Sequence, residues 1–240
     1  MKENKQDWVA GLIDGDGYFS FSKKGHAALE ITIDSRDQRC LHEVKKYFGG
    51  AIKPGRTPQS GGRGKWYRYK VHNKAGLLNV IRVVNGRLRN PIRILQLARI
   101  CEAYNITLLD TPKLSYNNSW LSGLIDSDGS VYLNKSAVQV YITVSQKNKL
   151  MLDILEDIYG GKVYANGKTG NFKWVVSRKQ EVLNLLDYFK EHPLMSKKMV
   201  RVNLIKDVYT GFKNSWYNKP ESSLERKQWS YLMLKWTDYS

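Results

Sequence analysis

Hydrophobic positions follow the same succession of patterns in both halves of the chain. In the first half, residues 8–15 are apolar on every side, which predicts a short buried helix. The spacing then changes to two, with Phe19 and Phe21 alternating with polar residues, as in a half-exposed strand. Later spacings predict a strand at about 27–34, a helix at 36–48, strands at 50–55 and 65–72, and helices at 74–84 and 91–104.

The second half repeats this succession. Its spacings predict a helix at 120–127, a strand through Val131 and Leu133, a strand at about 138–145, a helix at 147–159, strands at 162–166 and 172–177, and helices at 180–190 and 196–210. Each half therefore has the order αββαββα. Four antiparallel strands with helices on one face leave the other face of the sheet open to water or to a partner.

A direct sequence repeat supports this division into halves. The segment Trp8-Val-Ala-Gly-Leu-Ile-Asp-Gly-Asp-Gly17 recurs as Trp120-Leu-Ser-Gly-Leu-Ile-Asp-Ser-Asp-Gly129, and Ile31-Thr-Ile33 corresponds to Ile142-Thr-Val144. A match of this extent indicates duplication of a whole unit, and two copies are too few for a solenoid. We expect paired halves: an N-terminal unit at 1–105, a linker at 106–117 and a C-terminal unit at 118–240.

The end of the chain carries a segment that has no counterpart in the first half. Residues 222–236 begin with an N-cap serine and continue with helical apolar spacing. Trp229, Leu232 and Trp236 recur at that spacing. We therefore expect an additional helix whose apolar side chains pack into the core.

Charge indicates the class of partner. The chain has 39 Lys and Arg against 22 Asp and Glu, a net charge of +17 in 240 residues. Solubility requires a net charge of only about 2 to 8 in magnitude, so we expect a polyanionic partner, foremost nucleic acid.

Other features bear on the compartment. No apolar run approaches the length of a membrane span, and the first residues lack the apolar segment of a signal peptide. Cys40 and Cys101 stand at non-equivalent positions of the two halves, so no structural disulfide is expected. We expect an intracellular protein that does not enter a membrane.

Two acids of the repeat stand where a helix disfavours negative charge. Asp16 and Asp128 come at the ends of the two apolar helices, and the C-terminal end of a helix carries partial negative charge. A bound cation would offset this cost. The last-turn carbonyl groups lack helical partners, so the main-chain oxygens of Gly15 and Ser127 could join the carboxylates as ligands, an arrangement that suits Mg²⁺. Two such ends side by side would suit in-line phosphodiester hydrolysis.

Small residues in the same two helices favour close approach. Gly11 follows Ala10, and Gly123 follows Ser122. The absence of large side chains there allows two helices to pack closely. A metal site shared between the two acids requires this proximity.

Other sites can be weighed against this one. The motif resembles the start of a calcium loop, but Gly25 and Ala137 stand where that loop needs its bidentate glutamate, and Phe19 and Val131 take its glycine position. Zinc is also a poor fit, because the four histidines are scattered, at His26, His42, His72 and His192.

Two alternatives remain open from the residues alone. Composition does not exclude a Ser-His-Asp triad, although no Gly-x-Ser-x-Gly segment is present. Asp14 and Asp16 could also simply accept hydrogen bonds from nearby main-chain amides, an interpretation that the duplication weakens but does not eliminate.

The repeated motif resembles that of the LAGLIDADG homing endonucleases, specifically the single-chain class with two fused copies. The resemblance covers nearly the whole chain. It implies an α+β fold of two units related by a pseudo-two-fold axis, with saddle-forming antiparallel sheets and the motif helices at the interface. It also implies that Asp16 and Asp128 bind the metal, with Gly15 and Ser127 supplying main-chain oxygens, whereas Asp14 and Asp126 are structural.

Further site residues follow from the same resemblance. Gln146 corresponds to a glutamine that organises the water network, and Ser35 stands at its position in the first half. Lys198, rather than Lys197, matches a basic residue on the last helix of the family's site. In the first half Arg93 is the nearest candidate. This asymmetry suggests the hypothesis that the two DNA strands are cut at unequal rates.

The resemblance further implies that the sheets lie over DNA and read the major groove. Polar residues on the open faces would contact one half-site through Ser20, Ser22, Lys24, Thr32, Arg68 and Lys70, and the other through Tyr132, Asn134, Ser136, Gln139, Thr143 and Lys173. Arg56 and Arg63, in the Gly-rich segment 54–64, could follow the phosphate backbone. Because the two sets differ, the target should be pseudo-palindromic at most.

The implied function is site-specific cleavage of double-stranded DNA by a monomer across the minor groove, leaving short 3′ overhangs. Two or three Mg²⁺ ions would be shared between the acids, with Mn²⁺ or Ca²⁺ able to substitute in binding. The alternatives are an intron-splicing maturase that uses the same fold on RNA and a non-catalytic DNA-binding regulator. The presence of both acids favours cleavage. Family members are common in organellar introns, so we expect an organellar setting.

Overall fold

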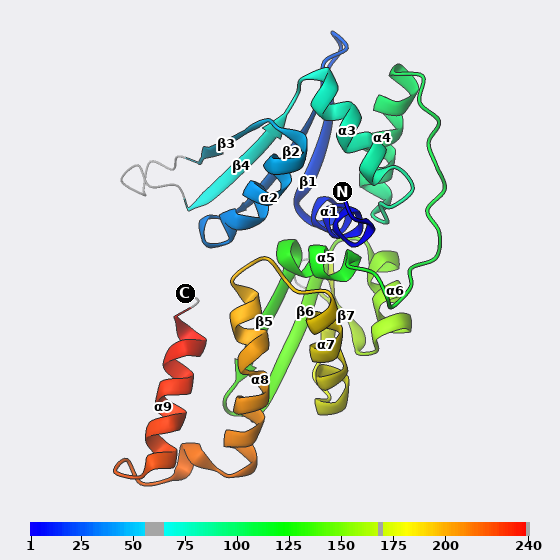
Figure 1. The fold of residues 1–240 in the computed structure, drawn as a ribbon. Helices are drawn as coiled ribbons and strands as arrows, with labels where there is room; N and C mark the ends of the chain where they lie inside the picture. Colours follow the sequence, from blue (N-terminus) through cyan, green and yellow to red (C-terminus); the bar gives the residue numbers. More distant parts are fainter. Residues whose placement is uncertain (56–64, 168–169, 239–240) are drawn as a thin grey trace.

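The protein, described by a computed structural model over residues 1–55, 65–167 and 170–238, consists of two units stacked on a pair of adjoining helices (Figure 1). The first unit contains one four-stranded antiparallel sheet with the strand order β1-β2-β4-β3. Its elements are α1 (Glu3–Asp16), β1 (Gly17–Phe21), β2 (Ala27–Asp34), the 3₁₀ turn η1 (Ser35–Asp37), α2 (Gln38–Phe48), β3 (Ala51–Pro54), β4 (Trp66–Val71), α3 (Lys74–Val84) and α4 (Pro91–Ala103).

The second unit repeats this topology with the strand order β5-β6-β8-β7. Its elements are α5 (Trp120–Asp128), β5 (Gly129–Asn134), β6 (Gln139–Gln146), α6 (Lys149–Tyr159), β7 (Lys162–Asn166), β8 (Asn171–Val176), α7 (Lys179–Glu191), α8 (Lys198–Lys213), the 3₁₀ turn η3 (Trp216–Asn218) and α9 (Leu224–Thr237). The predicted α+β class and the order αββαββα are thus confirmed in both halves. α1 begins five residues earlier than its apolar pattern indicated, because its first turns are polar.

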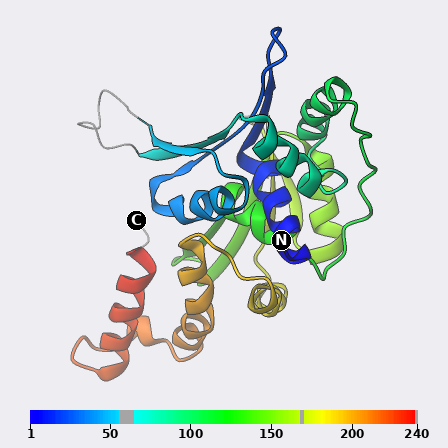
Figure 2. The ribbon, with the colours of Figure 1, turned by 45° about the horizontal axis from the view of Figure 1, so that its top comes forward.

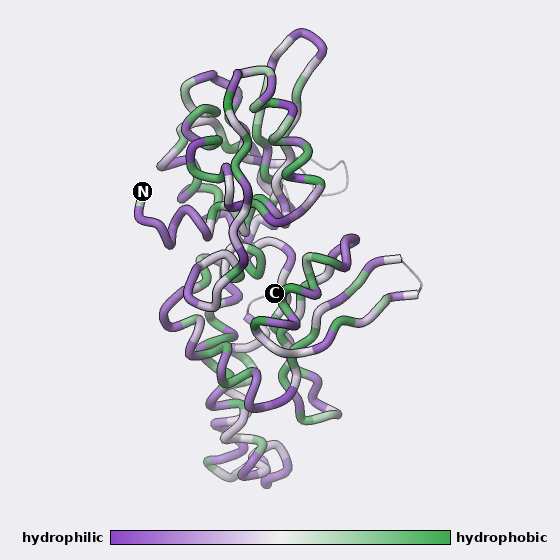
Figure 3. Tube along the Cα trace, turned by 90° about the vertical axis from the view of Figure 1, so that its right-hand side faces the viewer, coloured by the Kyte–Doolittle hydropathy of each residue, from purple (hydrophilic) through white to green (hydrophobic). Residues whose placement is uncertain are grey.

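Figure 3 shows this change of character along α1, which starts hydrophilic at the N-terminus and turns hydrophobic as it enters the molecule. From Trp8 to Asp14 every residue of α1 is buried, as is every residue of α5 from Trp120 to Asp126. Two helices that are apolar all round must be covered on all sides. They are covered by each other and by the two units.

α1 and α5 lie side by side between the two sheets (Figures 1 and 2). Two glycines make this approach possible. A Cβ atom on Gly11 would stand 2.0 Å from the main-chain oxygen of Trp120, and one on Gly123 would stand 2.0 Å from that of Trp8. The helix backbones therefore touch at these two points, as a shared site requires.

Alternation along the strands assigns each sheet a core face and an open face. In the first sheet Phe19 pairs with Leu29, and both side chains are buried against the helices. The neighbouring positions point the other way, so Thr32 pairs with Arg68 on the open face. The same alternation places the polar residues of β5, β6 and β8 on the open face of the second sheet.

The two units are joined by an irregular segment between α4 and α5 that runs along the first unit. Asn85 donates to the main-chain oxygen of Thr107 and accepts from the amide of Leu109, at 2.8 and 2.9 Å. Thr111 donates its hydroxyl to the main-chain oxygen of Leu88. No helix or strand lies between residues 104 and 119, all of which are described, and the division at 106–117 stays a prediction.

α9 packs against α8 at the outer edge of the second unit (Figure 1). Trp229, Leu232 and Trp236 are all buried, which confirms the prediction of an additional packing helix. Cys40 and Cys101 are free and buried. None of the described helices is long and apolar enough to cross a bilayer.

Candidate active site

The site is built where α1 and α5 end together. Asp16 is the last residue of α1, and Asp128 is the last residue of α5. A Cβ atom on Gly15 would stand 2.9 Å from a carboxylate oxygen of Asp128, which shows how closely the two helix ends approach. The structure therefore brings the two acids of the repeat to one place.

Burial and proximity raise the pKa of both acids. Burial, followed by the negative charge of Asp128, raises the pKa of Asp16 to about 7, although Lys198 and Arg93 act to lower it. Burial likewise raises the pKa of Asp128 to about 6, with Lys198, Arg93 and Gln146 opposing the shift. Two adjoining carboxylates that resist ionisation are stabilised in the charged form by a divalent cation.

The donor set fits a hard cation. Among the described residues no group of three or more His, Cys, Asp and Glu side chains is placed to hold a metal ion. The oxygens at this place are two carboxylates and the main-chain carbonyls of the last helical turns, of which those of Gly15 and Ser127 each also accept a hydrogen bond from a basic side chain. Mg²⁺ prefers a site with few protein ligands, in which water and substrate phosphate complete the coordination shell.

Each helix end is also held by one basic side chain. Lys198, which is buried at the start of α8, donates through Nζ to the main-chain oxygens of Ile125 and Asp126 at 2.8 Å and of Ser127 at 3.3 Å. Arg93 on α4 donates through Nη2 to the main-chain oxygen of Gly15 at 3.2 Å. Arg93 thus does for the first helix end what Lys198 does for the second.

The neighbouring Lys197 differs from Lys198 in exposure. Its side chain is exposed to solvent, whereas that of Lys198 is 8% exposed and directed at the end of α5. The burial of Lys198 favours it over Lys197 as the basic member of the site.

The two units differ in the polar side chains that lie near Asp16 and Asp128. Gln146, at the end of β6, donates through Nε2 to Oδ2 of Asp128. At the corresponding place in the first unit Ser35 lies in η1, and the nearby polar group is an ion pair in which Arg36 donates to Asp34 at 2.8 and 3.1 Å. The sequence did not single out this pair, because neither residue belongs to the repeated motif.

The other acids of the motif serve structure. Trp8 donates its indole N–H to Asp126 at 2.8 Å, and Trp120 donates to Asp14 at 2.7 Å, so each unit's tryptophan satisfies the acid of the opposite unit. Both carboxylates also accept main-chain amides from the loops before α4 and α8, namely those of Arg89, Asn90, Met195 and Ser196. The two tryptophans occupy equivalent positions in the repeat. This equivalence was the sequence signal that could have predicted their reciprocal hydrogen bonds.

A cavity of about 550 Å³ opens beside the acids. Its lining comes from both units and includes Asp16, Asp34, Asp37, Ser127, Lys198 and Arg201. Arg201 on α8 donates to the main-chain oxygens of Val131 and Trp236, which ties β5 and the end of α9 to this wall. Asp37 and Arg201 lie outside the repeated ten-residue motif and were not expected from the sequence.

Comparison with known proteins assigns this arrangement to a family. A model of the LAGLIDADG endonuclease family matches residues 9–104 and 121–209, once in each unit and over most of the chain. The chain belongs to the LAGLIDADG endonuclease family. The family depends on divalent metal ions, in agreement with the paired acids.

Curated relatives of this LAGLIDADG protein carry two kinds of name. An intron-encoded RNA maturase, bI4 of Saccharomyces cerevisiae, is 33% identical over 96% of the chain, and the match covers 36% of that protein. An intron-encoded DNA endonuclease, ai2b of Dictyostelium discoideum, is 32% identical over 100% of the chain and 91% of its own length. The chain therefore spans about a third of the yeast relative and nearly all of the Dictyostelium one.

Solved structures share the fold. The LAGLIDADG homing endonuclease I-LtrWI bound to target DNA matches with a TM-score of 0.66 over 96% of both chains, at 18% identity. The meganuclease I-AabMI bound to uncleaved DNA matches with a TM-score of 0.68 over 92% of this chain and 96% of its own, also at 18% identity. At this level of identity the likeness establishes the fold of the two LAGLIDADG units.

The open face of the first LAGLIDADG unit is ionic. Glu30 on β2 accepts from Lys70 at 2.7 Å and lies 3.5 Å from Arg68, and Arg68 also donates to Thr32 at 3.3 Å. Ser20 lies on the same face, while Ser22 and Lys24 are exposed at the β1–β2 turn. Glu30 was missed in the sequence, although the period-two pattern places it on this face. Arg56 and Arg63 lie outside the described residues.

The open face of the second LAGLIDADG unit is aromatic. Tyr132 and Tyr141 stack with ring centroids 5.0 Å apart, and the Lys173 ammonium lies 5.3 Å from the Tyr132 ring. Gln139 accepts from the Tyr141 hydroxyl and donates to the main-chain oxygen of Ser177, so its amide is already engaged. Asn134 and Ser136 are exposed beside the β5–β6 turn.

Thr143 is buried, which the sequence did not predict. It lies on the open face as predicted, but its side chain is only 1% exposed. Neighbouring strands and their side chains cover it, so it has no surface to offer to DNA in this conformation. The burial of Thr143 argues against a direct contact between this side chain and DNA.

Proposed function

We propose that this protein is a site-specific, Mg²⁺-dependent endonuclease that cuts both strands of DNA. The observation that carries the proposal is the meeting of two partly buried acids, Asp16 and Asp128, whose pKa is raised at the adjoining ends of the motif helices. A protein that only binds nucleic acid gains nothing from this energetic cost. The endonuclease names of several relatives support the same activity.

Asp16, Asp128 and the main-chain oxygens of Gly15 and Ser127 would hold two or three Mg²⁺ ions, for which Mn²⁺ or Ca²⁺ could substitute in binding. Bound ions supply a water nucleophile at neutral pH and stabilise charge on the phosphate. The protein's own groups orient these ligands. Gln146 holds the Asp128 carboxylate by a hydrogen bond, as a group outside the ligand shell should.

Two basic side chains complete the proposed centre. Arg93 and Lys198 approach the acids from opposite units and lower the pKa of both. Positive charge fixed beside a scissile phosphate stabilises the charge that develops during displacement. Because Gln146 has no glutamine counterpart in the first unit, we further propose that the two strands are cut at unequal rates.

The open sheet faces would bind the DNA on either side of this centre. One chain contributes both faces, so we propose that it acts as a monomer on a long target, with its acids reaching across the minor groove to leave short 3′ overhangs. Arg and Lys favour guanine edges, whereas tyrosine and threonine side chains offer apolar contact and hydroxyl groups. An ionic face and an aromatic face favour a target whose halves differ in sequence.

An RNA maturase is the second candidate, since the yeast relative carries that name at 33% identity. The net charge of +17 would serve either nucleic acid. The two activities differ in their need for the acids, because RNA binding by a folded surface requires neither Asp16 nor Asp128.

Cleavage of a DNA library tests the nuclease function. Purified protein is incubated with a library of duplexes that includes the uninterrupted sequence of the gene flanking its own coding sequence, first with Mg²⁺ and then with EDTA. We expect metal-dependent double-strand cuts at one site, which Asp16→Asn and Asp128→Asn each abolish. Absence of cleavage with retained binding and splicing of the flanking intron RNA would establish the maturase instead.

We also propose that the coding sequence resides in an organellar intron. The support is that several relatives are named as intron-encoded proteins. Sequencing the genomic flanks tests this directly, and a nuclear, uninterrupted locus would contradict it.

A further inference from the structure

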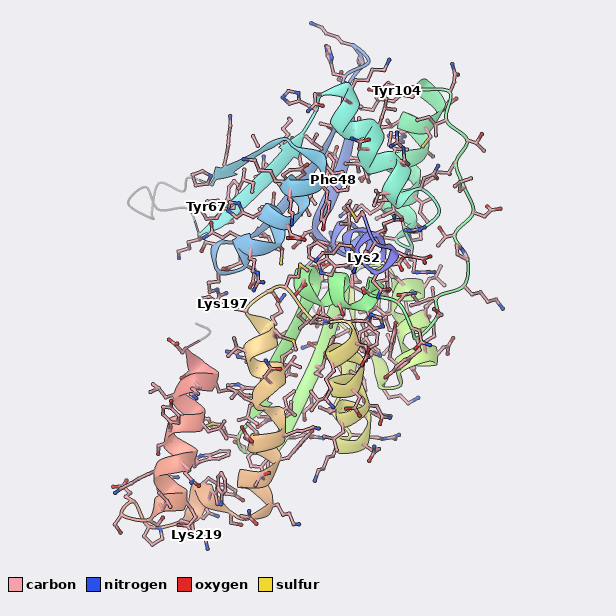
Figure 4. All side chains as sticks on the ribbon, viewed as in Figure 1. Lys2, Phe48, Tyr67, Tyr104, Lys197 and Lys219 are labelled. Atoms are coloured by element: carbon pink, nitrogen blue, oxygen red, sulfur yellow. The ribbon has the colours of Figure 1, made fainter. Side chains whose placement is uncertain are left out.

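Asp37 belongs to the first unit, but its carboxylate binds the second. Its Oδ1 accepts a hydrogen bond from the main-chain N–H of Lys197 at 2.7 Å, across a separation of 160 positions. Asp37 is only 3% exposed, although Lys197 at the other end of this part-buried bond is exposed. Figure 4 labels Lys197 at the start of α8, where α8 faces the first unit.

This bond holds the end of α8 that carries the basic residue of the site. Lys197 is the N-cap residue of α8, and its own side chain makes no capping hydrogen bond. The next residue is Lys198, whose Nζ reaches the last turn of α5, including the main-chain oxygen of Ser127 beside Asp128. The position of the first turn of α8 therefore determines where this positive charge meets the end of α5.

The equivalent residues at the N-terminal ends of α6 and α4 make their side-chain hydrogen bonds within their own units. The sequence repeat places Asn148 at the position of Asp37, and Asn148 accepts from the amide of Leu150 in its own helix, at 3.0 Å. α4 begins with Asn90, which accepts from the amide of Ile92 at 3.1 Å and so caps its own helix. Only α8, of the two helices that carry basic site residues, has its N-cap residue held by a side chain of the opposite unit.

We propose that Asp37 is a positioning residue for the catalytic centre, which holds α8 from across the unit boundary so that Lys198 meets the end of α5. This proposal rests on the nuclease function proposed above. Asp37 acts through the Lys197 amide and Lys198. Because the contact is one-sided, loss of Asp37 should impair one half of the centre more than the other and should slow the cutting of one strand.

Strand-specific kinetics test the proposal in the full chain. Asp37→Ala is compared with wild type in single-turnover cleavage of duplexes labelled on either strand. We expect one strand to be cut about tenfold more slowly or worse, so that nicked DNA accumulates, because small misplacements of catalytic groups cost rate steeply. Asp37→Asn keeps an oxygen that can accept from the Lys197 amide, and we expect it to restore both rates.

Asn148→Ala provides the matched control. It also removes a side-chain cap from a helix, but that helix carries no group of the site. We expect it to lower the melting temperature without strand bias. A comparable strand bias in Asn148→Ala would overturn the proposal. The proposal would also be overturned if Asp37→Ala lowers the melting temperature but cuts both strands at wild-type rates.

Hydrogen exchange gives a readout that does not depend on cleavage. In Asp37→Ala, amides in the last turn of α5 and the first turn of α8 should exchange faster than in wild type, whereas Asn148→Ala should change exchange only around α6. Unchanged exchange at the end of α5 in Asp37→Ala refutes the positioning role. Wild-type protein that cuts no DNA would refute the nuclease function, while the exchange comparison still decides whether Asp37 positions α8.

Discussion

Replacing Asp16 with asparagine should stabilise the metal-free protein while it abolishes cleavage. The pKa of Asp16 is raised from 3.8 to about 7, first by burial and second by the charge of Asp128. Because its pKa is raised, this partly buried acid holds its proton more readily in the folded state than in the unfolded chain. Ionisation of Asp16 above its raised pKa therefore lowers the stability of the folded state.

The numbers of protons bound by the folded and unfolded states determine how stability changes with pH. Between about pH 4 and pH 7 the folded state holds a proton on Asp16 that the unfolded chain has released, so stability falls as pH rises through this window. A shift of about 3 units corresponds to about 4 kcal/mol at pH 8, as an upper value. Asp128 acts in the same direction, and because the two acids interact, their contributions do not add.

Asparagine removes the charge but leaves a polar group to be buried, so part of this energy is realised. We expect Asp16→Asn to gain about 2 kcal/mol at pH 8, which for a chain of this size raises the melting temperature by about 4–8 °C. The gain should shrink toward pH 5, where wild-type Asp16 is largely protonated. Mg²⁺ should stabilise wild type at pH 8 and have little effect on the variant.

Thermal and urea unfolding in EDTA at pH 5 and pH 8 measure these differences. Asp207→Asn removes an exposed carboxylate of α8 and serves as the control, for which we expect no pH-dependent gain. If Asp16→Asn is no more stable than wild type at pH 8, the charge of Asp16 does not destabilise the fold. If the gain is equal at both pH values, the charge is not its source.

Three further predictions concern the packing and the basic residue. Gly123→Ala places a Cβ atom 2.0 Å from the main-chain oxygen of Trp8 and should destabilise the fold by about 3 kcal/mol in urea, whereas Gly167→Ala, which meets no atom within 4 Å, should not. Trp120→Phe deprives the buried Asp14 of a hydrogen bond and should cost about 1–3 kcal/mol in the same assay; a neutral result would contradict the structural role of that bond. Lys198→Met should slow cleavage by about 100-fold while exposed Lys197→Met leaves the rate near wild type, and equal rates for the two variants would remove Lys198 from the centre.

Much of the fold could be predicted because its signals are local. The change of spacing from helical to alternating, repeated in both halves, placed every strand within a few residues of its observed bounds. The acids of the motif were found for a similar reason, since Asp16 and Asp128 end two helices whose apolar character and length are visible in the sequence. Gly11 and Gly123 indicated that those helices meet.

Contacts between the units were much less visible. Trp8 and Trp120 each donate a hydrogen bond to an acid of the opposite unit, and these bonds join residues more than 100 positions apart. The bond from Asp37 to Lys197 has no counterpart in the repeat. The burial of Thr143 also escaped prediction, because alternation assigns a residue to a face of the sheet but does not say which side chains cover that face.

The sequence by itself determined the order of elements, the duplication, the basic charge and the two acids at helix ends. These follow from periodicity and composition, which depend on neighbours along the chain. Only the tertiary structure decided that Arg93 and Lys198 hold the two helix ends, that Asp37 reaches the opposite unit, and that the two open faces differ in chemistry. The physical reason is that close packing of two nearly equal units fixes distances between residues far apart in sequence, and side-chain reach and burial depend on those distances.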